Sequence, residues 1–390
     1  MLLTLTHSKC KKGFVTGMTH ATTPATTPAT SETAQDAVSA QVIFPATLGL
    51  DVGDKLIHYC FIGAGGDILD EGRVRTYDAD VRNRLGTFGH CRAVIEAGQH
   101  SPWLYRLLRT LGDEVIVANP RKFQLIRQSR HKTDHSDAEL LARVGRVDPV
   151  LLSPIEHRSE QYQVDLALLR SRGELVTVRT GLINHVRGSV KAMGEVLPRW
   201  DADSFHRHAP DHLPAALAPT LLGVIEVIAK TTEQIKAMEK TLDQVAAERY
   251  PQAAVLRQVN GAGPITALTF VLTLGDPARF ARSRYVGPYL GLTPRQRQSG
   301  DRAPQLRITK AGDSALRSLL VQSAHYILGP FGKDCNLRRW GLERLERGGQ
   351  NQKKRVLVAV ARKLSVLLHH LLVTGEVYDP FFGKGADNLD

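Results

Sequence analysis

Short runs of apolar residues separated by turn-forming residues occupy the first part of the chain, a pattern typical of β-strands. Two of these runs end at acidic residues, Asp51 and Glu96. Three strands in succession, followed by alternating helices and strands, predict an α/β fold with a mixed sheet. Strands are expected at residues 46–51, 57–62, 68–76, 93–96 and 114–118, and helices at 80–88, at 102–111 and from Pro120 onwards.

The middle of the chain has a helical pattern with apolar residues seven positions apart. Pro198, Pro210 and Pro214 interrupt this pattern and divide it into two long helices. The two helices could form an antiparallel hairpin within one chain or a coiled coil between chains, and the sequence leaves both arrangements open. The repeating positions are Leu168, Leu175 and Leu182 in the first helix and Leu221, Ile228, Ile235 and Leu242 in the second.

Changes in composition along the chain predict its domain organisation. Residues 1–44 contain the polar, proline-punctuated stretch ATTPATTPAT and are expected to be disordered. We expect an α/β domain at 45–150, a helical or coiled-coil region at 151–250, a mainly α-helical domain at 251–380 and a tail at 381–390. The glycines of the segment 259–267 predict either a helix–hairpin–helix element facing phosphate or a simple helix connector.

The charge of the chain suggests a polyanionic partner, with nucleic acid the leading class. Among 390 residues, 51 are Lys or Arg and 39 are Asp or Glu, which gives a net charge of +12. A basic protein without such a partner is the alternative, and the distribution of charge argues against it. Between Arg279 and Arg317 only Asp301 and Asp313 oppose a dense set of basic residues, which favours a phosphate-binding surface. The set is Arg279, Arg282, Arg284, Arg295, Arg297, Arg302, Arg307, Lys310 and Arg317.

The cysteines and the hydropathy of the chain indicate a reducing cytoplasm. The chain has 4 cysteines, none in a CxxC pair, and their wide spacing does not suggest a disulfide framework. No run of 18 apolar residues occurs, so no membrane span is expected. The basic N-terminus lacks a following apolar stretch, so no signal peptide is expected either.

Four acidic residues form the main candidate site. Asp51 and Glu96 end strands, where an unpaired buried carboxylate would be costly. Asp134 and Asp137 are three residues apart and share one face of a helix that begins there. A divalent cation would explain the set, and oxygen-only ligands suit Mg²⁺ or Mn²⁺. A helix capping box formed by Ser136 and Glu139 is the alternative explanation for the second pair alone.

A serine lies within the arginine-rich segment. Ser299 is followed by Gly300 in a polar stretch that also contains Arg295 and Arg297. A serine hydroxyl needs activation before it attacks phosphorus, and arginines stabilise the charge of the transition state. Spacing alone does not distinguish Ser299 from the other serines of the chain.

Taken together in this order, six motifs resemble the DEDD transposases of the insertion-sequence one-ten family, which are bridge-RNA-guided recombinases. The likeness covers residues 46–380 and departs from the family at Gln99 and His100, after Gly98. The motifs are GLDVG at 49–53, IEAGQHSPWLYRLL at 95–108, ANPRKFQLIRQSRHKTDHSDAELLA at 118–142, VNGAGPITA at 259–267, YLGLTPRQRQSG at 289–300 and RITKAGDSALR at 307–317.

This resemblance implies a fold, a chemistry and a set of partners. The fold is a RuvC-like, RNase H-type domain followed by a C-terminal transposase domain. Asp51, Glu96, Asp134 and Asp137 would be catalytic acids that bind Mg²⁺ or Mn²⁺, and Ser299 would be the nucleophile. The partners would be donor DNA, target DNA and a bridge RNA, bound by a homo-oligomer (dimer or tetramer) in the bacterial cytoplasm at the nucleoid. Phosphate contacts are expected from Arg295, Arg297, Arg302, Arg307 and Lys310.

Two other functions also agree with the residues. A Mg²⁺-dependent RuvC-like nuclease or junction resolvase would use the acids to activate water and would not need Ser299. A non-enzymatic scaffold that binds nucleic acid would use the basic surface alone. A covalent adduct between protein and DNA would separate the first alternative from a transposase, and strand cleavage with Mg²⁺ would separate the second.

Overall fold

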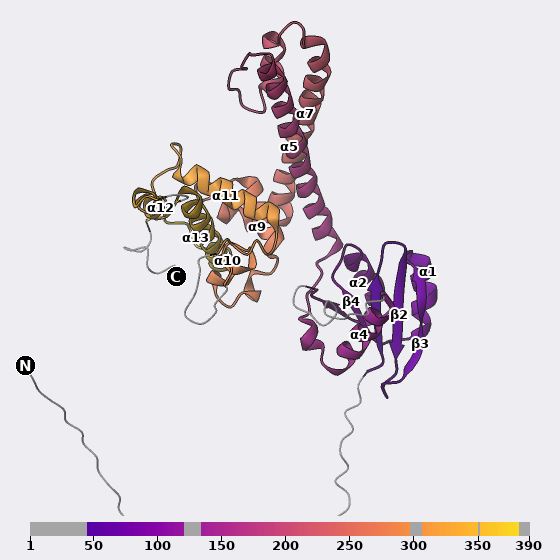
Figure 1. Cartoon of the computed structure of the whole chain (residues 1–390). Coiled ribbons are helices and arrows are strands. Elements are labelled where there is room, and N and C mark those ends of the chain that lie inside the picture. Colours follow the sequence, from indigo (N-terminus) through magenta and orange to yellow (C-terminus); the bar gives the residue numbers. More distant parts are fainter. Residues whose placement is uncertain (1–44, 121–133, 297–305, 350–351, 382–390) are drawn as a thin grey trace, which may run out of the picture.

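The first part of the chain folds into a five-stranded mixed sheet with helices on both faces (Figure 1). The structure is a computed structural model and describes residues 45–120, 134–296, 306–349 and 352–381. We call this part the sheet unit. Its elements are β1 (Thr47–Val52), β2 (Leu56–Ile62), β3 (Ile68–Arg75), α1 (Asp78–Leu85), η1 (Gly86–Phe88), β4 (Arg92–Glu96), α2 (Ser101–Thr110), β5 (Glu114–Ala118), α4 (Asp134–Val147) and η2 (Pro149–Leu152).

The strands lie in the order β3-β2-β1-β4-β5. The first three form an antiparallel meander, and β4 and β5 extend the sheet in parallel with β1. Parallel neighbours need a crossover connection, which the helices between β3 and β4 and between β4 and β5 provide. The mixed α/β architecture expected from the sequence is confirmed, and it is consistent with an RNase H-like fold.

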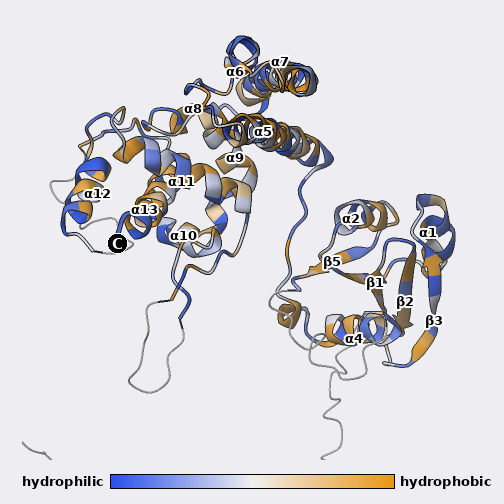
Figure 2. Ribbon diagram, turned by 45° about the horizontal axis from the view of Figure 1, so that its top comes forward, coloured by the Kyte–Doolittle hydropathy of each residue, from blue (hydrophilic) through white to orange (hydrophobic). Residues whose placement is uncertain are grey.

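The two faces of the sheet are covered by different helices (Figure 2). Leu85 of α1 and Leu108 of α2 belong to the same buried cluster as Leu50 of β1. On the other face, α4 lies directly against β1. A Cβ atom at Gly49 would be 2.0 Å from the carbonyl oxygen of Ala138, so only glycine allows this close contact. The start of α4 is therefore held beside the end of β1.

Two long helices, α5 (Glu160–Ala192) and α7 (Ala218–Arg249), form an antiparallel hairpin within one chain. The turn of this hairpin contains α6 (Phe205–His208) and η3 (Pro210–His212). A buried carboxylate, Asp165, accepts a hydrogen bond from the Tyr250 hydroxyl at 2.8 Å and joins the ends of the two helices. The intrachain hairpin is one of the two expected arrangements, and the coiled coil between chains stays a prediction.

The apolar repeat describes α7 better than α5. All four predicted positions of α7 are buried, whereas the predicted leucines of α5 are only half-buried. In α5 the residues that face α7 include Leu169 and Arg179. The Arg179 guanidinium contacts Asp203 at 2.5 Å and the Thr232 hydroxyl at 3.4 Å. Polar contacts of this kind place a charged residue between α5 and α7, in what we call the seam of the hairpin. A purely apolar repeat does not reveal such a residue.

The remaining helices pack beside the base of the hairpin and form what we call the helical unit (Figure 1). Its core is continuous with Leu169 of α5 and with Leu242 and Val245 of α7. Gly261 has a φ of +94°, and a Cβ there would be 2.9 Å from Ile327 Cγ1. The elements are α8 (Ala253–Leu256), α9 (Pro264–Leu274), η4 (Pro277–Arg279), η5 (Ser283–Tyr285), α10 (Val286–Tyr289), α11 (Ser314–Leu328), α12 (Asn336–Glu346) and α13 (Gln352–Thr374).

Helix α13 is apolar enough, over its 23 residues, to cross a membrane by length and composition alone. However, 56% of its most apolar window is buried inside the structure, as expected of a core helix. Val360, Leu364 and Leu368 of α13 belong to the core of the helical unit. Within the described residues, α13 therefore acts as the central helix of a bundle.

Several sequence-based expectations fall outside the described residues. These are the disordered N-terminal segment, the helix from Pro120 and most of the C-terminal tail. The candidate nucleophile Ser299 and the phosphate-contacting candidates Arg297 and Arg302 also lie outside them.

Candidate metal centre

Asp51 and Glu96 stand at equivalent places on neighbouring parallel strands. Leu50 of β1 is paired with Ile95 of β4, and each acidic residue directly follows its member of that pair. Carboxyl ends of parallel strands meet at the same edge of a sheet, so the two acids come from one edge. Both side chains are partly exposed there. The register therefore brings together two residues that are far apart in sequence.

Alternation along the strands indicates which face of the sheet these acids share. Gly49 would meet the backbone of Ala142 in α4, and Val94 is 2.3 Å from a Cβ built on Gly145 of α4. Side chains two residues apart on a strand point to the same face. Asp51 and Glu96 therefore belong to the face that α4 covers.

The first turn of α4 completes this edge. Near the end of the helix, the Gly145 carbonyl accepts a hydrogen bond from Arg92, at the start of β4, at 3.0 Å. At its beginning, an oxygen atom of Asp134 lies within 4.8 Å of one of Asp51, near the end of β1, so the helix runs antiparallel to both strands. Its N-terminus, with Asp134 and Asp137 in the first turn, therefore lies toward the carboxyl ends of the strands. The Asp134 side chain is 68% exposed, whereas Asp137 is buried. Acidic residues suit the positive end of the helix dipole, so this placement also favours the helix.

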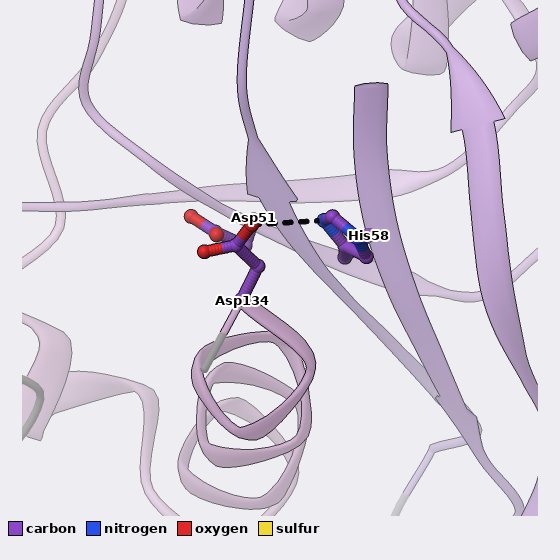
Figure 3. Close-up of side chains that lie close together, drawn as sticks. All are labelled: Asp51, His58 and Asp134. Atoms are coloured by element: carbon purple, nitrogen blue, oxygen red, sulfur yellow. Dashed lines mark ion pairs between the residues drawn. The ribbon is translucent and has the colours of Figure 1, made fainter. Parts of the chain in front are cut away.

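One group of potential metal ligands is compact among the described residues. It consists of Asp51, His58 and Asp134, whose donor atoms all lie within 4.8 Å of one another (Figure 3). The Nδ1 atom of His58 is 3.6 Å from Oδ2 of Asp134. The structure thus brings together two of the four predicted acids. Glu96 and Asp137 come from adjacent elements but are not members of this compact group.

The donor chemistry of the group fits a hard divalent ion with one softer ligand. Two carboxylates supply oxygen atoms, the preferred ligands of Mg²⁺ and Mn²⁺. The neighbouring Cys60 is buried against α4, and burial raises the pKa of its thiol to about 11. Cys60 therefore stays protonated at neutral pH and is a poor ligand, because metals bind the thiolate.

The loop that follows Glu96 is held by a short hydrogen-bonded chain. The Ser101 hydroxyl donates to the Gly98 carbonyl at 2.8 Å and accepts from the Gly98 N–H at 3.0 Å. Nε2 of His157, in the segment leading to α5, is 2.9 Å from the same hydroxyl. Burial, with the charge of Arg106, lowers the pKa of His157, so its imidazole is neutral. This chain connects the edge that carries Glu96 to the start of the hairpin.

A second candidate region lies in the helical unit, at the two ends of the segment that contains Ser299. The N–H of Arg295 donates to the Arg307 carbonyl at 2.9 Å, and Thr309 donates to Thr293 at 2.9 Å. Arg295, Arg307 and Lys310 are exposed. The backbone at residues 293–295 is therefore paired with the backbone at residues 307–309, and these two arms carry basic side chains. In the sequence, Ser299 lies between the two arms.

Sequence reasoning missed His58. It predicted the strand that contains this residue but assigned the histidine no role, because the pairing partner of a strand cannot be read from its apolar pattern. In the structure His58 is directly opposite Asp51 in the antiparallel ladder between β1 and β2. A polar residue in an otherwise apolar strand was the available signal.

Two family models match the chain, one over each part. The model of the DEDD transposases of the IS110 family matches residues 48–194, which include the sheet unit and α5. The model described as "Transposase IS116/IS110/IS902 family" matches residues 253–329 in the helical unit. Together they cover both candidate regions.

Curated relatives match most of the chain. A putative transposase (y4qE) of Sinorhizobium fredii is 31% identical over 302 residues, which are 72% of this chain and 71% of the relative. The transposase for insertion sequence element IS1111A of Coxiella burnetii is 28% identical over 347 residues, 85% of this chain and 90% of the relative. A pilin gene-inverting protein of Moraxella bovis is 26% identical over 275 residues, 68% and 74% of the two chains.

Proposed function

The chain belongs to the IS116/IS110/IS902 family of transposases, and we propose that it recombines DNA through a metal-assisted attack by a serine. The observation that carries this proposal is the convergence of Asp51 and Asp134 from separate elements, with donor atoms inside a 4.8 Å group. Enzymes of this family cut and rejoin DNA, and a divalent metal is implied by its DEDD domain.

The acids of the sheet unit hold the metal in this proposal. Asp51 and Asp134 provide the compact oxygen donors, and Glu96 and Asp137 approach the same edge from β4 and α4. These residues would hold Mg²⁺ or Mn²⁺, which would supply polarisation of the scissile phosphate and stabilisation of transition-state charge. The glycine contact between β1 and α4 keeps the two elements in register, so the carboxylates are positioned before DNA arrives.

Ser299 is the proposed nucleophile. Its Oγ loses a proton and forms a bond to the scissile phosphorus, while the bond from phosphorus to a deoxyribose oxygen breaks and that oxygen takes up a proton. The product is a phosphoserine linkage between protein and DNA, which conserves bond energy for rejoining. The backbone pairing of Arg295 with Arg307 supports this role, because it places two cationic residues at the ends of the segment that contains Ser299.

The proposed partners are donor DNA, target DNA and a bridge RNA that pairs with both. The net charge of +12 and its concentration in the Arg-rich segment suit long polyanions. Sequence choice would come from RNA–DNA base pairing, and the protein would bind mainly phosphate and shape, by analogy with other RNA-guided systems. The acids and Ser299 belong to different parts of the chain, so we propose that a dimer or tetramer assembles the complete site.

Recombination between donor and target plasmids, with the RNA of the flanking DNA supplied, tests the proposal. Ser299→Ala is expected to abolish both recombination and the covalent protein–DNA adduct. Asp51→Asn is expected to lower both by about 10²- to 10³-fold, the loss typical of removing one electrostatic stabiliser. Ser318→Ala, on the exposed side of α11, and Asp78→Asn, on α1, serve as matched controls.

The alternatives predict different results in the same assay. A covalent protein–DNA adduct that persists in Ser299→Ala would show that Ser299 is not the nucleophile. Cleavage that survives in Ser299→Ala without any adduct would favour a nuclease that activates water. Binding without cleavage in the wild-type protein, with Mg²⁺ present, would favour a scaffold.

A further inference from the structure

His58 is placed on the sheet as if it belonged to the metal centre. It lies opposite Asp51 in the ladder between β1 and β2, and it has the same side-chain direction as Cys60 and Ile62. Those two residues pack against Ala138 and Ala142 of α4. His58 therefore faces the first turns of α4, and its side chain is 25% exposed. The imidazole comes from a third element, and its ligand nitrogen lies within 4.8 Å of carboxylate oxygens of Asp51 and Asp134 (Figure 3).

The distance between His58 and Asp134 distinguishes two kinds of contact. Nδ1 of His58 is 3.6 Å from Oδ2 of Asp134, which is too long for a hydrogen bond. Two ligands that each lie about 2.1 Å from one ion are separated by roughly 3.0 to 3.4 Å in octahedral or tetrahedral geometry. The observed separation is close to that range and needs only a small side-chain movement to reach it.

We propose that His58 supplies a nitrogen ligand to the divalent ion bound by Asp51 and Asp134. This inference rests on the metal site of the proposed function and adds a residue that the four-acid pattern does not contain. Mg²⁺ prefers oxygen ligands, whereas transition-metal ions accept imidazole nitrogen. A nitrogen donor in this position shifts the preference of the site from Mg²⁺ toward Mn²⁺.

Another histidine near the same helix turn shows why His58 is distinct. His135 belongs to the first turn of α4, and its Nε2 is 3.3 Å from Oε2 of Glu71 on β3. Both of these side chains are about half exposed, and neither is part of the compact donor group. His135 thus forms a surface ion pair of small energetic value. It provides a matched control for a histidine substitution beside the site.

The test is direct observation of bound Mn²⁺ in the full-length protein by electron paramagnetic resonance. A nitrogen ligand gives a ¹⁴N coupling in the pulsed spectrum, which a site made only of oxygen atoms lacks. We expect this coupling in the wild type and in His135→Asn, and its loss in His58→Asn. The dissociation constant for Mn²⁺ is expected to rise about 10-fold in His58→Asn. The constant for Mg²⁺, measured by competition, is expected to change less.

A second variant keeps the test decisive if His58→Asn folds poorly. His58→Asp replaces the nitrogen donor by oxygen, so it should still bind Mn²⁺, without the ¹⁴N coupling and with a shift of preference toward Mg²⁺. Thermal unfolding without metal checks that each variant is folded.

The results also separate this inference from the proposed metal site. If Mn²⁺ binding requires Asp51 but the ¹⁴N coupling is absent from the wild type or survives in His58→Asp, His58 is not a ligand and the acid site stands. If Mn²⁺ binds equally to the wild type and to Asp51→Asn, the acid site itself is rejected, and the role of His58 with it.

Discussion

The sheet unit and the helical unit present their candidate residues in different ways. In the sheet unit the acids stand at the ends of hydrogen-bonded strands and at the first turn of a packed helix. In the helical unit Arg295 and Arg307 stand at the base of a segment between η5/α10 and α11. Sites on strands and helices are positioned more accurately than sites on connecting segments. The contrast agrees with the proposal that the acids of the sheet unit form a preorganised metal site.

The base of the Ser299 segment is nevertheless built with little freedom. A Cβ at Gly291 would be 2.2 Å from the Ala311 backbone nitrogen, and one at Gly312 would be 2.3 Å from the Tyr289 carbonyl oxygen. Both glycines have a φ of +69°, which side-chain-bearing residues rarely adopt. The two arms are therefore fixed where they leave the helical unit.

Removal of divalent metal should give the largest difference between the activities proposed for the two units, namely strand cleavage and DNA binding. EDTA is expected to lower DNA strand cleavage by about 10²- to 10³-fold, because the carboxylates alone do not stabilise the charge of the transition state. DNA binding through the exposed Arg295, Arg307 and Lys310 should change little. Cleavage of end-labelled donor DNA and a gel-shift assay in the same buffer measure the two effects.

Adding Mn²⁺ back is the control, and it should restore cleavage without altering binding. Parallel loss of cleavage and binding would show that the metal supports DNA binding as well. The assignment of cleavage to the sheet unit and of DNA binding to the helical unit would then be wrong.

The contact between β1 and α4 should be the most sensitive structural point of the sheet unit. Gly49→Val places a side chain where its Cβ would be 2.0 Å from the Ala138 carbonyl oxygen and 2.5 Å from the Ala142 nitrogen. We expect a loss of about 3 kcal/mol in the free energy of unfolding, because neither backbone atom can move without separating helix and sheet. Urea unfolding followed by circular dichroism measures the change.

A matched substitution in the hairpin should have the opposite sign. A Cβ at Gly173 of α5 meets no atom within 4 Å, so Gly173→Ala should stabilise the helix by about 1 kcal/mol. An equal loss of stability in Gly49→Val and Gly173→Ala would mean that the close contact between β1 and α4 does not determine which residues the sheet unit tolerates at position 49.

The sheet unit was also the part that the sequence predicted best. The strand expected at 114–118 is observed as Glu114–Ala118, and the one expected at 57–62 is observed as Leu56–Ile62. These short apolar runs are buried on both faces, so their pattern alone identifies them. The positions of Asp51 and Glu96 at strand ends followed from the same pattern.

What the sequence could not give was any property that depends on pairing between elements. His58 meets Asp51 only through the register of β1 against β2. The seam of α5 was predicted at Leu168, but the buried residue is Leu169. Arg179 lies between the two helices, where one of its guanidinium nitrogens donates to Asp203 and Thr232, and those partners come from elsewhere in the hairpin. The pattern of one helix carries no information about such partners.

The helical unit should show a pH dependence of stability that arises at His369, and this is the smallest of the expected effects. His369 of α13 is buried, with Nε2 3.0 Å from the Pro277 carbonyl oxygen and Nδ1 3.0 Å from the Ser283 hydroxyl. A carbonyl oxygen only accepts, so Nε2 carries the proton and Nδ1 accepts from the serine. Burial is the main cause that lowers the pKa of His369 below its usual 6.5, and the adjacent His370 adds to it.

Because the folded pKa of His369 is the lower one, the unfolded chain binds more protons as the pH falls through about 6.5. The stability contributed by neutral His369 is therefore complete above that pH and is lost as the pH drops through the folded pKa. We expect Tm to decrease from pH 7.5 to pH 5.5 more steeply in the wild type than in His369→Gln, whose side chain does not titrate. His325→Gln is the control, since His325 is exposed on α11 and should leave the wild-type slope unchanged. Equal slopes in the wild type and in His369→Gln would show that this histidine is not the source of the pH dependence.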